Sequence, residues 1–434
     1  MKKLFYKTYT IALIALMMTG LVACARNTET IDNHSTEIAE AQQSPAPQPT
    51  PDPTPEPSPT PQPTPDPPSE QAPEAAPEPE ESETEPEQAQ STSETSPYIT
   101  IREMEFSTSL TTLDLTHMAL TSEEIEPLRY MTNLEELIIA DSIQVYGGRT
   151  IPSLDIAPLA GLTNLTSLTL SGNNIRDIQP LAGMTQLISL GLAGNEINNI
   201  TVLAGMPHLR YLDLFDNHVS DITPLANLPN LVSLHASMNQ ISDITPLENL
   251  TNLQSLILSV NQVNNIDTLV GLTNLTILGL DFNQITDISP LTNLTNLTFM
   301  DLASNQIVDI AVLANFANLS DHLNLADNQI SNITPLMALT NVQSFALSNN
   351  QIADLTPLTG LTNLVSLMLD DNLITDISPL AGLVDMVHLT LRENQIVDIS
   401  PLQYLQDLNS VELAGNPISD WGPVDHISWV GGRP

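Results

Sequence analysis

Leucine recurs along most of this chain with a period of 22 residues, and no other feature of the sequence restricts the fold as strongly. A representative unit is LTSLTLSGNNIRDIQPLAGMTQ, which begins at Leu165 and fits the scheme L-x-x-L-x-L-x-x-N-x-I-x-x-I-x-P-L. Such a unit cannot bury its leucines alone, so neighbouring units must stack into one repeat solenoid. The fourteen units begin at Leu110, Leu134, Leu165, Leu187, Leu209, Leu231, Leu253, Leu275, Leu297, Leu319, Val342, Leu364, Met386 and Leu408.

Each unit predicts a short strand followed by a short turn. Leucines that lie two apart, such as Leu168 and Leu170, place one face of a strand against the core. Serine or threonine followed by proline, as in Thr223-Pro224 and Ser289-Pro290, predicts an N-cap residue and the first residue of a helical turn. We therefore expect an α/β repeat solenoid: a curved leucine-rich-repeat array with a parallel sheet on the concave face and short helical or 3-10 turns on the convex face.

An asparagine stands three residues after the second inward leucine in most units. Its side-chain amide can satisfy backbone groups that are buried where the chain turns. We interpret these asparagines as structural and assign them no binding role. They are Asn173, Asn195, Asn217, Asn239, Asn261, Asn283, Asn305, Asn328, Asn350, Asn372, Asn394 and Asn416.

A recurring phrase, found as NQISDITPLENLTNL from Asn239 and NQITDISPLTNLTNL from Asn283, closely resembles the internalin-type leucine-rich repeats of Gram-positive surface proteins. The resemblance extends over roughly Leu110 to Asn416 and implies a concave face that binds host or envelope proteins. The chain departs from that family because it lacks the long helical N-terminal cap, the immunoglobulin-like domain after the repeats and the C-terminal sortase signal. Host adhesion is therefore left open as one form of binding.

The first residues predict export and lipid anchoring. Three lysines precede an apolar stretch, Ile11 to Ala23, which is too short to span a bilayer, so residues 1–23 are expected to be a signal peptide. The sequence Leu-Val-Ala-Cys that ends at Cys24 resembles the lipobox of bacterial lipoproteins, in which the cysteine is lipidated. The alternative is an unmodified cysteine after an ordinary signal peptide. Cys24 is the only cysteine, which excludes a disulfide within the monomer and a cysteine-based metal site.

Residues 24–97 are expected to form a disordered stalk. Proline alternates with polar and acidic residues from Ser44 onward, a composition that cannot form a packed core. Alternating proline favours polyproline II helix, so the proline-rich part can extend over roughly 170 Å. The formal net charge is −40, and removal of the three signal lysines leaves −43, which disfavours nucleic acid and anionic lipid headgroups as partners.

The candidate binding site lies on the concave face, at the positions that flank the inward leucines. Most of these positions carry Ser, Thr, Ala or Gly, whereas the units from Leu209 to Leu297 carry larger or charged side chains. Neighbouring strands lie about 4.8 Å apart, so these residues are expected to form one patch that binds a partner. Drift at solvent positions is the alternative. The predicted binding residues are Tyr211, Asp213, Phe215, Asp216, His235, Met238, Ile257, Val260, Ile277, Asp281, Phe282, Phe299 and Asp301.

Two arrangements resemble chemical sites. His235 is expected to face Asp213 and to flank Ser233 and Ser237, but an open solenoid face offers neither a cleft nor an oxyanion hole, so we assign no catalytic residue. An acidic strip could bind calcium, although the known calcium-loop spacings are absent and a solvated acidic face is the alternative. The strip comprises Asp327, Asp370, Asp371 and Glu393, with His388 and Arg392 beside it. We predict no enzyme activity, no cofactor and no metal site.

Two irregular segments and the C-terminus complete the prediction. The insertion from Ile143 to Ser153 is either a contact loop or a tolerated insertion, and one extra residue falls near Asp321. Residues 98–434 are expected to form the leucine-rich-repeat domain, with a C-terminal cap made by Trp421, Pro423, Ile427 and Trp429. We therefore predict a monomeric, lipid-anchored protein on the extracellular face of the cell membrane that binds a host or envelope protein. A passive envelope scaffold or a glycan-binding protein is the alternative.

Overall fold

The computed structural model describes residues 97–140, 153–320 and 322–433. The predicted signal peptide, Cys24, the stalk up to residue 96, positions 143–152 of the insertion and position 321 lie outside the described residues. Within those residues, no helix is both long enough and apolar enough to cross a membrane.

Three-residue strands recur once in each repeat, after a hairpin of two longer strands. Their bounds are β1 Tyr98–Ile101, β2 Met104–Ser107, β3 Thr112–Asp114, β4 Glu136–Ile138, β5 Ser167–Thr169, β6 Ser189–Gly191, β7 Tyr211–Asp213, β8 Ser233–His235, β9 Ser255–Ile257, β10 Ile277–Gly279, β11 Phe299–Asp301, β12 His322–Asn324, β13 Ser344–Ala346, β14 Ser366–Met368, β15 His388–Thr390, β16 Ser410–Glu412 and β17 Trp429–Gly431.

A short 3-10 helix lies between each pair of successive strands from β3 onward. The bounds are η2 Glu126–Tyr130, η3 Ala157–Leu159, η4 Gln179–Gly183, η5 Thr201–Gly205, η6 Thr223–Asn227, η7 Thr245–Leu247, η8 Asp267–Gly271, η9 Ser289–Asn293, η10 Ala311–Asn315, η11 Thr334–Ala338, η12 Thr356–Leu358, η13 Ser378–Gly382, η14 Ser400–Tyr404 and η15 Gly422–Val424.

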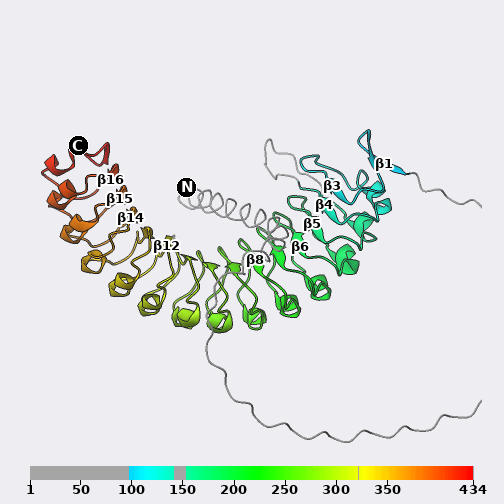
Figure 1. The fold of residues 1–434 in the computed structure, drawn as a ribbon, viewed down its shortest axis with the longest axis horizontal. Coiled ribbons are helices and arrows are strands. Elements are labelled where there is room, and N and C mark those ends of the chain that lie inside the picture. The colour runs from blue at the N-terminus through cyan, green and yellow to red at the C-terminus, as the bar shows by residue number, and fades with distance from the viewer. Residues whose placement is uncertain (1–96, 141–152, 321, 434) are drawn as a thin grey trace, which may run out of the picture. The chain divides into compact units, whose positions relative to one another are not determined.

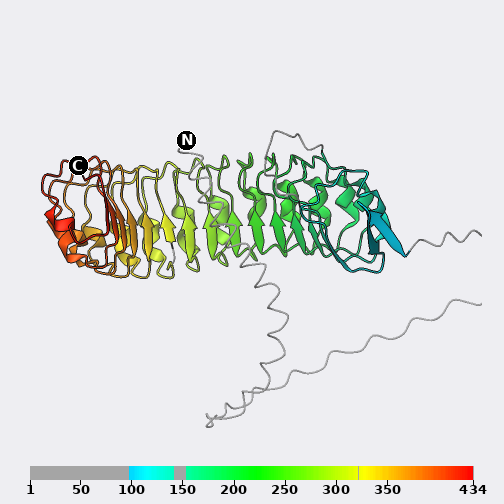
Figure 2. The same cartoon turned by 90° about the horizontal axis from the view of Figure 1, so that it is seen from above.

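The repeats build one curved array with the sheet on its inner side. Strands β3 to β17 form a parallel sheet in chain order. Figure 1 shows these strands along the inside of the curve and the 3-10 turns along the outside, and Figure 2 shows the strands side by side. Curvature follows because strands pack about 4.8 Å apart, whereas the outer turns need more room. The observed fold is the predicted leucine-rich-repeat solenoid.

The hydrophobic core is continuous along the array. Leu168 and Leu170 are fully buried, as are the leucines at most of the equivalent positions in other repeats. The register places Leu168 beside Leu190 of the next strand, so each repeat buries its leucines against its two neighbours.

The repeated asparagine bonds its own coil to the preceding coil. Asn261 Nδ2 donates to the carbonyl oxygens of Ala236 at 2.9 Å and Leu258 at 3.0 Å. Asn261 Oδ1 accepts the backbone N–H of Ile241 at 2.9 Å. The same donor bonds recur from Asn173 to Asn416. The structural role predicted for these asparagines is confirmed.

The 3-10 turns are capped by a residue other than the predicted one. Ser289 is the first residue of η9 rather than its N-cap, and the N-cap residue, Ile288, makes no side-chain capping bond. Instead, Asp287 Oδ1 accepts the backbone N–H of Ser289 at 2.8 Å, and Oδ2 accepts its hydroxyl at 3.0 Å. Aspartate commonly accepts the amide two residues along the chain, so Asp287 supplies the capping oxygen from two positions before the serine that we predicted. The backbone and hydroxyl bonds from Ser289 lower the pKa of Asp287 below its ordinary value.

A hairpin precedes the first parallel strand. Strands β1 and β2 are antiparallel, with Ile99 paired to Phe106. Ile99 and Ile101 are buried, so this hairpin contributes to the N-terminal end of the core. The repeat pattern did not predict it.

The C-terminal cap differs from the prediction at one tryptophan. Trp421 packs against the core and Ile427 is buried, as predicted. Trp429, however, is 54% exposed. Side chains alternate along β17, so Val430 points to the core while Trp429 lies beside Ser410 on the concave side. The prediction that Trp429 covers the core is therefore wrong.

Candidate binding surface

The sheet register brings the predicted binding residues together. Ile277 and Phe299 are neighbours at the first position of their strands. Asp213, His235 and Ile257 are neighbours at the third position. The thirteen predicted residues, which we call the central patch, therefore lie on strands β7 to β11 and on the residues that directly follow them. The structure agrees with the predicted contiguity.

Aromatic and charged side chains of the patch contact one another and a neighbouring arginine. The rings of Phe215 and His235 stack with their centroids 5.1 Å apart. Asp213 Oδ1 lies 3.2 Å from His235 Nδ1, so the protonated imidazole would form an ion pair there. The Arg210 guanidinium lies over the Tyr211 ring, 5.8 Å from its centroid. His235 thus faces Asp213, as the sequence predicted.

Five patch residues are buried rather than solvated, which corrects the expectation of an open face. These are His235, Ile257, Asp281, Phe299 and Asp301. Close neighbours on the sheet account for part of this burial. Ile257 occupies space beside Gly279, where an added Cβ would lie 3.0 Å from Ile257 Cγ2. The ring of Phe299 lies 6.2 Å from that of His322. The half-buried and exposed members are therefore the ones that offer area to a partner.

Burial changes the acidity of two aspartates in the patch. It raises the pKa of Asp281 to about 6. The pKa of Asp301 is raised well above its ordinary value by burial and by the neighbouring charge of Asp281. The Asp301 carboxylate also accepts the Ala303 N–H and the Asn324 Nδ2, both at 3.1 Å. Burial therefore disfavours the charged form of both carboxylates.

Four patch residues adopt the left-handed backbone conformation directly before the repeated asparagine. Asp216, Met238, Val260 and Phe282 have φ values of 52°, 57°, 57° and 54°. The equivalent position is left-handed in the other repeats as well, with glycine at Gly172, Gly194 and Gly415 and polar residues at Ser304, Asp327, Asn349, Asp371 and Glu393. The left-handed region is disfavoured for bulky residues and most of all for a β-branched valine. Three neighbouring repeats thus retain large apolar side chains where glycine would fit with less strain.

The described residues do not build a catalytic triad or a metal site. His235 Nε2 and Ser237 Oγ are buried and neither forms a hydrogen bond, whereas a triad requires a bond between nucleophile and base. In the acidic strip, the Asp370 carboxylate accepts the Arg392 N–H at 2.7 Å. No group of three or more His, Cys, Asp or Glu residues in the described ranges is placed to hold a metal ion.

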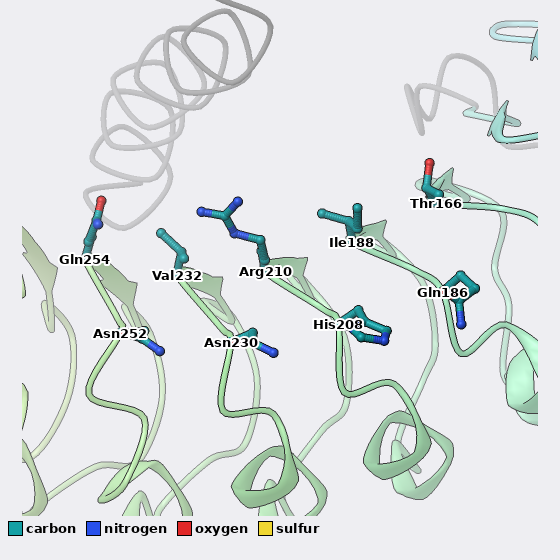
Figure 3. A pocket seen from close by; sticks show the side chains of 9 residues that line it. All are labelled: Thr166, Gln186, Ile188, His208, Arg210, Asn230, Val232, Asn252 and Gln254. Carbon is teal, nitrogen blue, oxygen red and sulfur yellow. The ribbon is translucent and has the colours of Figure 1, made fainter. Parts of the chain in front are cut away.

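A second hollow borders the sheet on the side where the strands begin, and the sequence did not predict it. Two rows of side chains line it: Ile188, Arg210 and Val232 directly before their strands, and Gln186 and His208 two residues before the first row (Figure 3). Its volume is about 620 Å³. We call it the edge groove. A sequence signal was present, because the LTNL phrase changes to MTQL and MPHL at these two repeats.

Comparison with known proteins defines the family. A model for leucine-rich repeats in two copies matches residues 207–249, 251–293 and 340–382, and another leucine-rich-repeat model matches residues 163–219. An internalin of Listeria monocytogenes, InlF, is 33% identical, with a TM-score of 0.64 over 72% of this chain and 88% of that chain. The chain belongs to the internalin-like leucine-rich-repeat family.

Two further solved structures share the fold of this internalin-like chain. Internalin InlJ of Listeria monocytogenes is 21% identical, with a TM-score of 0.61 over 74% of this chain and 72% of that chain. A leucine-rich-repeat protein of Leptospira interrogans is 20% identical, with a TM-score of 0.60 over 74% of this chain and 96% of that chain. No curated protein matches the chain. The resemblance to internalins drawn from the repeat phrase is confirmed.

Proposed function

We propose that this internalin-like chain is a lipid-anchored binding protein on the extracellular face of the cell membrane. Its concave face captures a protein partner of host or envelope origin at the central patch. Family membership supports this function, since leucine-rich-repeat solenoids typically bind proteins. Catalysis is not part of the proposal, because no serine hydroxyl within the described residues is bonded to His235.

The row of strained apolar residues is the observation that carries the proposal. The left-handed conformation costs roughly 1–2 kcal/mol for a residue other than glycine. Met238, Val260 and Phe282 all bear this cost in consecutive repeats. Val260 is 41% exposed, so core packing does not explain its side chain. Other repeats place glycine or a polar residue at this left-handed position, so the apolar side chains are what distinguish these three repeats, and we attribute them to contact with a partner.

The size and composition of the concave face also support protein binding. The number of strands, multiplied by their spacing of about 4.8 Å and by the strand length, gives the concave face an area of roughly 800 Å². This area is close to one partner's share of a standard protein interface. Tyr211, Phe215 and Phe282 are half-buried, so each offers aromatic area to a partner. Aromatic side chains contribute a disproportionate part of binding energy at such interfaces. Phe299 is buried and is a weaker candidate anchor.

The N-terminal segments supply the proposed anchor. Residues 1–23 would direct export, and two acyl chains on Cys24 would hold the protein stably, since a single chain binds membranes only marginally. Residues 24–97 would act as a spacer, whose proline-rich part can reach roughly 170 Å, between the membrane and the repeat domain of residues 98–434.

The test begins with capture of partners from envelope and host-cell extracts by the immobilised full-length protein. A captured protein is identified, purified and added back, and hydrogen exchange is measured with and without it. We expect added protection at strands β7 to β11 and at the residues that directly follow them. Protection confined to the outer 3-10 turns would contradict the proposal. Capture of glycans without any protein would favour the glycan-binding alternative.

A further inference from the structure

The edge groove lies where a second row of asparagines is interrupted. In most repeats the asparagine of the LTNL phrase donates to a carbonyl of the preceding coil, as Asn230 Nδ2 does to Pro207 O at 2.9 Å. Gln186 and His208 replace this asparagine in two consecutive repeats and make no such bond within the described part of the chain. Gln186 instead lies 3.4 Å from the adjacent Thr185 hydroxyl. Both side chains are therefore available to a ligand.

Arg210 is an unpaired cation beside this interruption. Among the described arginines, four form ion pairs with carboxylates, namely Arg102, Arg129, Arg176 and Arg433. Arg210 is exposed and forms no ion pair with any described residue, although its guanidinium contacts the Tyr211 ring. Arg392 is also exposed and without an ion pair among the described residues, but it lies beside the acidic strip, with its backbone N–H bonded to Asp370, whereas no carboxylate lines the groove around Arg210.

The side chains around Arg210 define the chemistry of the groove. Ile188, which is 40% exposed, and the half-buried Val232 flank Arg210 on the two neighbouring coils (Figure 3). Gln254 and other amides extend the lining, and none of the lining residues is an aspartate or a glutamate. The groove thus combines a cation, hydrogen-bonding amides and aliphatic surface in an otherwise acidic protein.

We propose that the edge groove binds an extended segment of a protein partner through an aspartate or glutamate side chain of that segment. Arg210 receives the carboxylate, because a guanidinium binds carboxylates with two parallel hydrogen bonds. Amide side chains meet the peptide backbone, and Ile188 and Val232 meet an aliphatic side chain beside the acid. A groove that spans five coils at about 4.8 Å is roughly 20 Å long, which accommodates about six extended residues.

Charge complementarity favours this occupant. One guanidinium without a second arginine beside it suits a single carboxylate, whereas a polyanion would meet the negative charge of the rest of the chain. The inference rests on the proposed protein-binding function, but it concerns residues outside the central patch. The two can therefore be tested separately.

The experiment selects peptides from a random heptapeptide display library on the full-length protein and measures the affinity of synthetic copies. We expect the selected sequences to share an Asp or Glu beside an aliphatic residue. Arg210→Gln should weaken their binding about tenfold or more, since a bond to a charged group contributes roughly 1.5–3 kcal/mol. The peptide affinity of the Arg210→Lys variant should lie between those of the wild type and the Arg210→Gln variant. Arg392→Gln, which changes another exposed arginine without an ion pair among the described residues, should leave the affinity unchanged.

Several results would overturn the proposal. The proposal fails if the selected peptides share no acidic position or if they bind Arg210→Gln as tightly as the wild type. It also fails if the only carboxylate that supports binding is the free C-terminus of the peptide. A synthetic peptide of residues 78–90 tests the chain's own acidic stalk. If it displaces the selected peptides through Arg210, the stalk rather than a partner is the occupant. The proposed function and the groove can fail separately. If the captured protein gives no hydrogen-exchange protection at the central patch while peptides still bind through Arg210, the proposed function is refuted and the groove proposal stands.

Discussion

Replacing Asn261 with alanine measures how much the repeated asparagine stabilises the array. Asn261 is 9% exposed, and its side chain satisfies the carbonyls of Ala236 and Leu258 and the N–H of Ile241. Each buried backbone group left without a partner costs roughly 1–3 kcal/mol. Asn239 and Asn283 still donate to the carbonyls of Ala236 and Leu258, at 3.2 Å and 3.0 Å, so only the Ile241 N–H loses its partner. We therefore expect the free energy of unfolding to fall by about 1–3 kcal/mol.

The assay is urea denaturation followed by circular dichroism, with Asn264→Ala as the matched control. Asn264 belongs to the same repeat, is exposed and forms no hydrogen bond with any described residue. We expect the control to unfold like the parent, since exposed substitutions usually change stability by less than about 0.5 kcal/mol. If the Asn261→Ala and Asn264→Ala variants unfold at the same urea concentration, the asparagine row does not stabilise the solenoid as argued.

Three further predictions follow from the backbone, the capping carboxylates and the anchor. Val260→Gly should raise the free energy of unfolding by about 1 kcal/mol by relieving the left-handed strain while weakening partner binding, and a loss of stability in thermal denaturation would refute the strain argument. The lowered pKa of Asp287 means that its stabilisation is present above the ordinary value of 3.8 and is lost as the pH falls below it. Asp287→Asn keeps a capping oxygen, as Asn199 does in its repeat, so it should reduce the drop in Tm between neutral and acidic pH, and an unchanged drop would count against this role. Cys24→Ser should abolish labelled-lipid incorporation and release the protein or leave it unprocessed, whereas unchanged membrane retention and labelling would exclude Cys24 as the anchor.

The strict period made the architecture predictable, because stacked units repeat the same contacts. The inward leucines and the role of Asn261 depend only on position within a unit, so both were correct. The cap of the 3-10 turns was misassigned by two residues, since the capping oxygen comes from Asp287 and not from Ser289. Trp429 was misplaced because its orientation depends on where β17 begins, which a repeat pattern does not define at the chain end.

Features that depend on several neighbouring coils were harder to predict. The burial of Ile257 depends on Gly279 of the next strand, and this cannot be inferred from one repeat. The left-handed conformation of Phe282 was likewise not visible in the leucine pattern, although glycine at Gly172 gave a signal. The edge groove was missed because its signal is the replacement of asparagine by Gln186 and His208, which looks like ordinary surface variation.

Partner capture by the double variant Phe215→Ser, Phe282→Ser tests the central claim most directly. Both side chains are half-buried on the concave face, whereas Tyr404 in η14, which is 59% exposed, provides Tyr404→Ser as a matched aromatic control on the outer side. We predict that the double variant loses the captured partner at an almost unchanged Tm and that the control retains it. Capture that persists in the double variant would show that the central patch is not the binding surface, and unfolding would show that these two rings belong to the core.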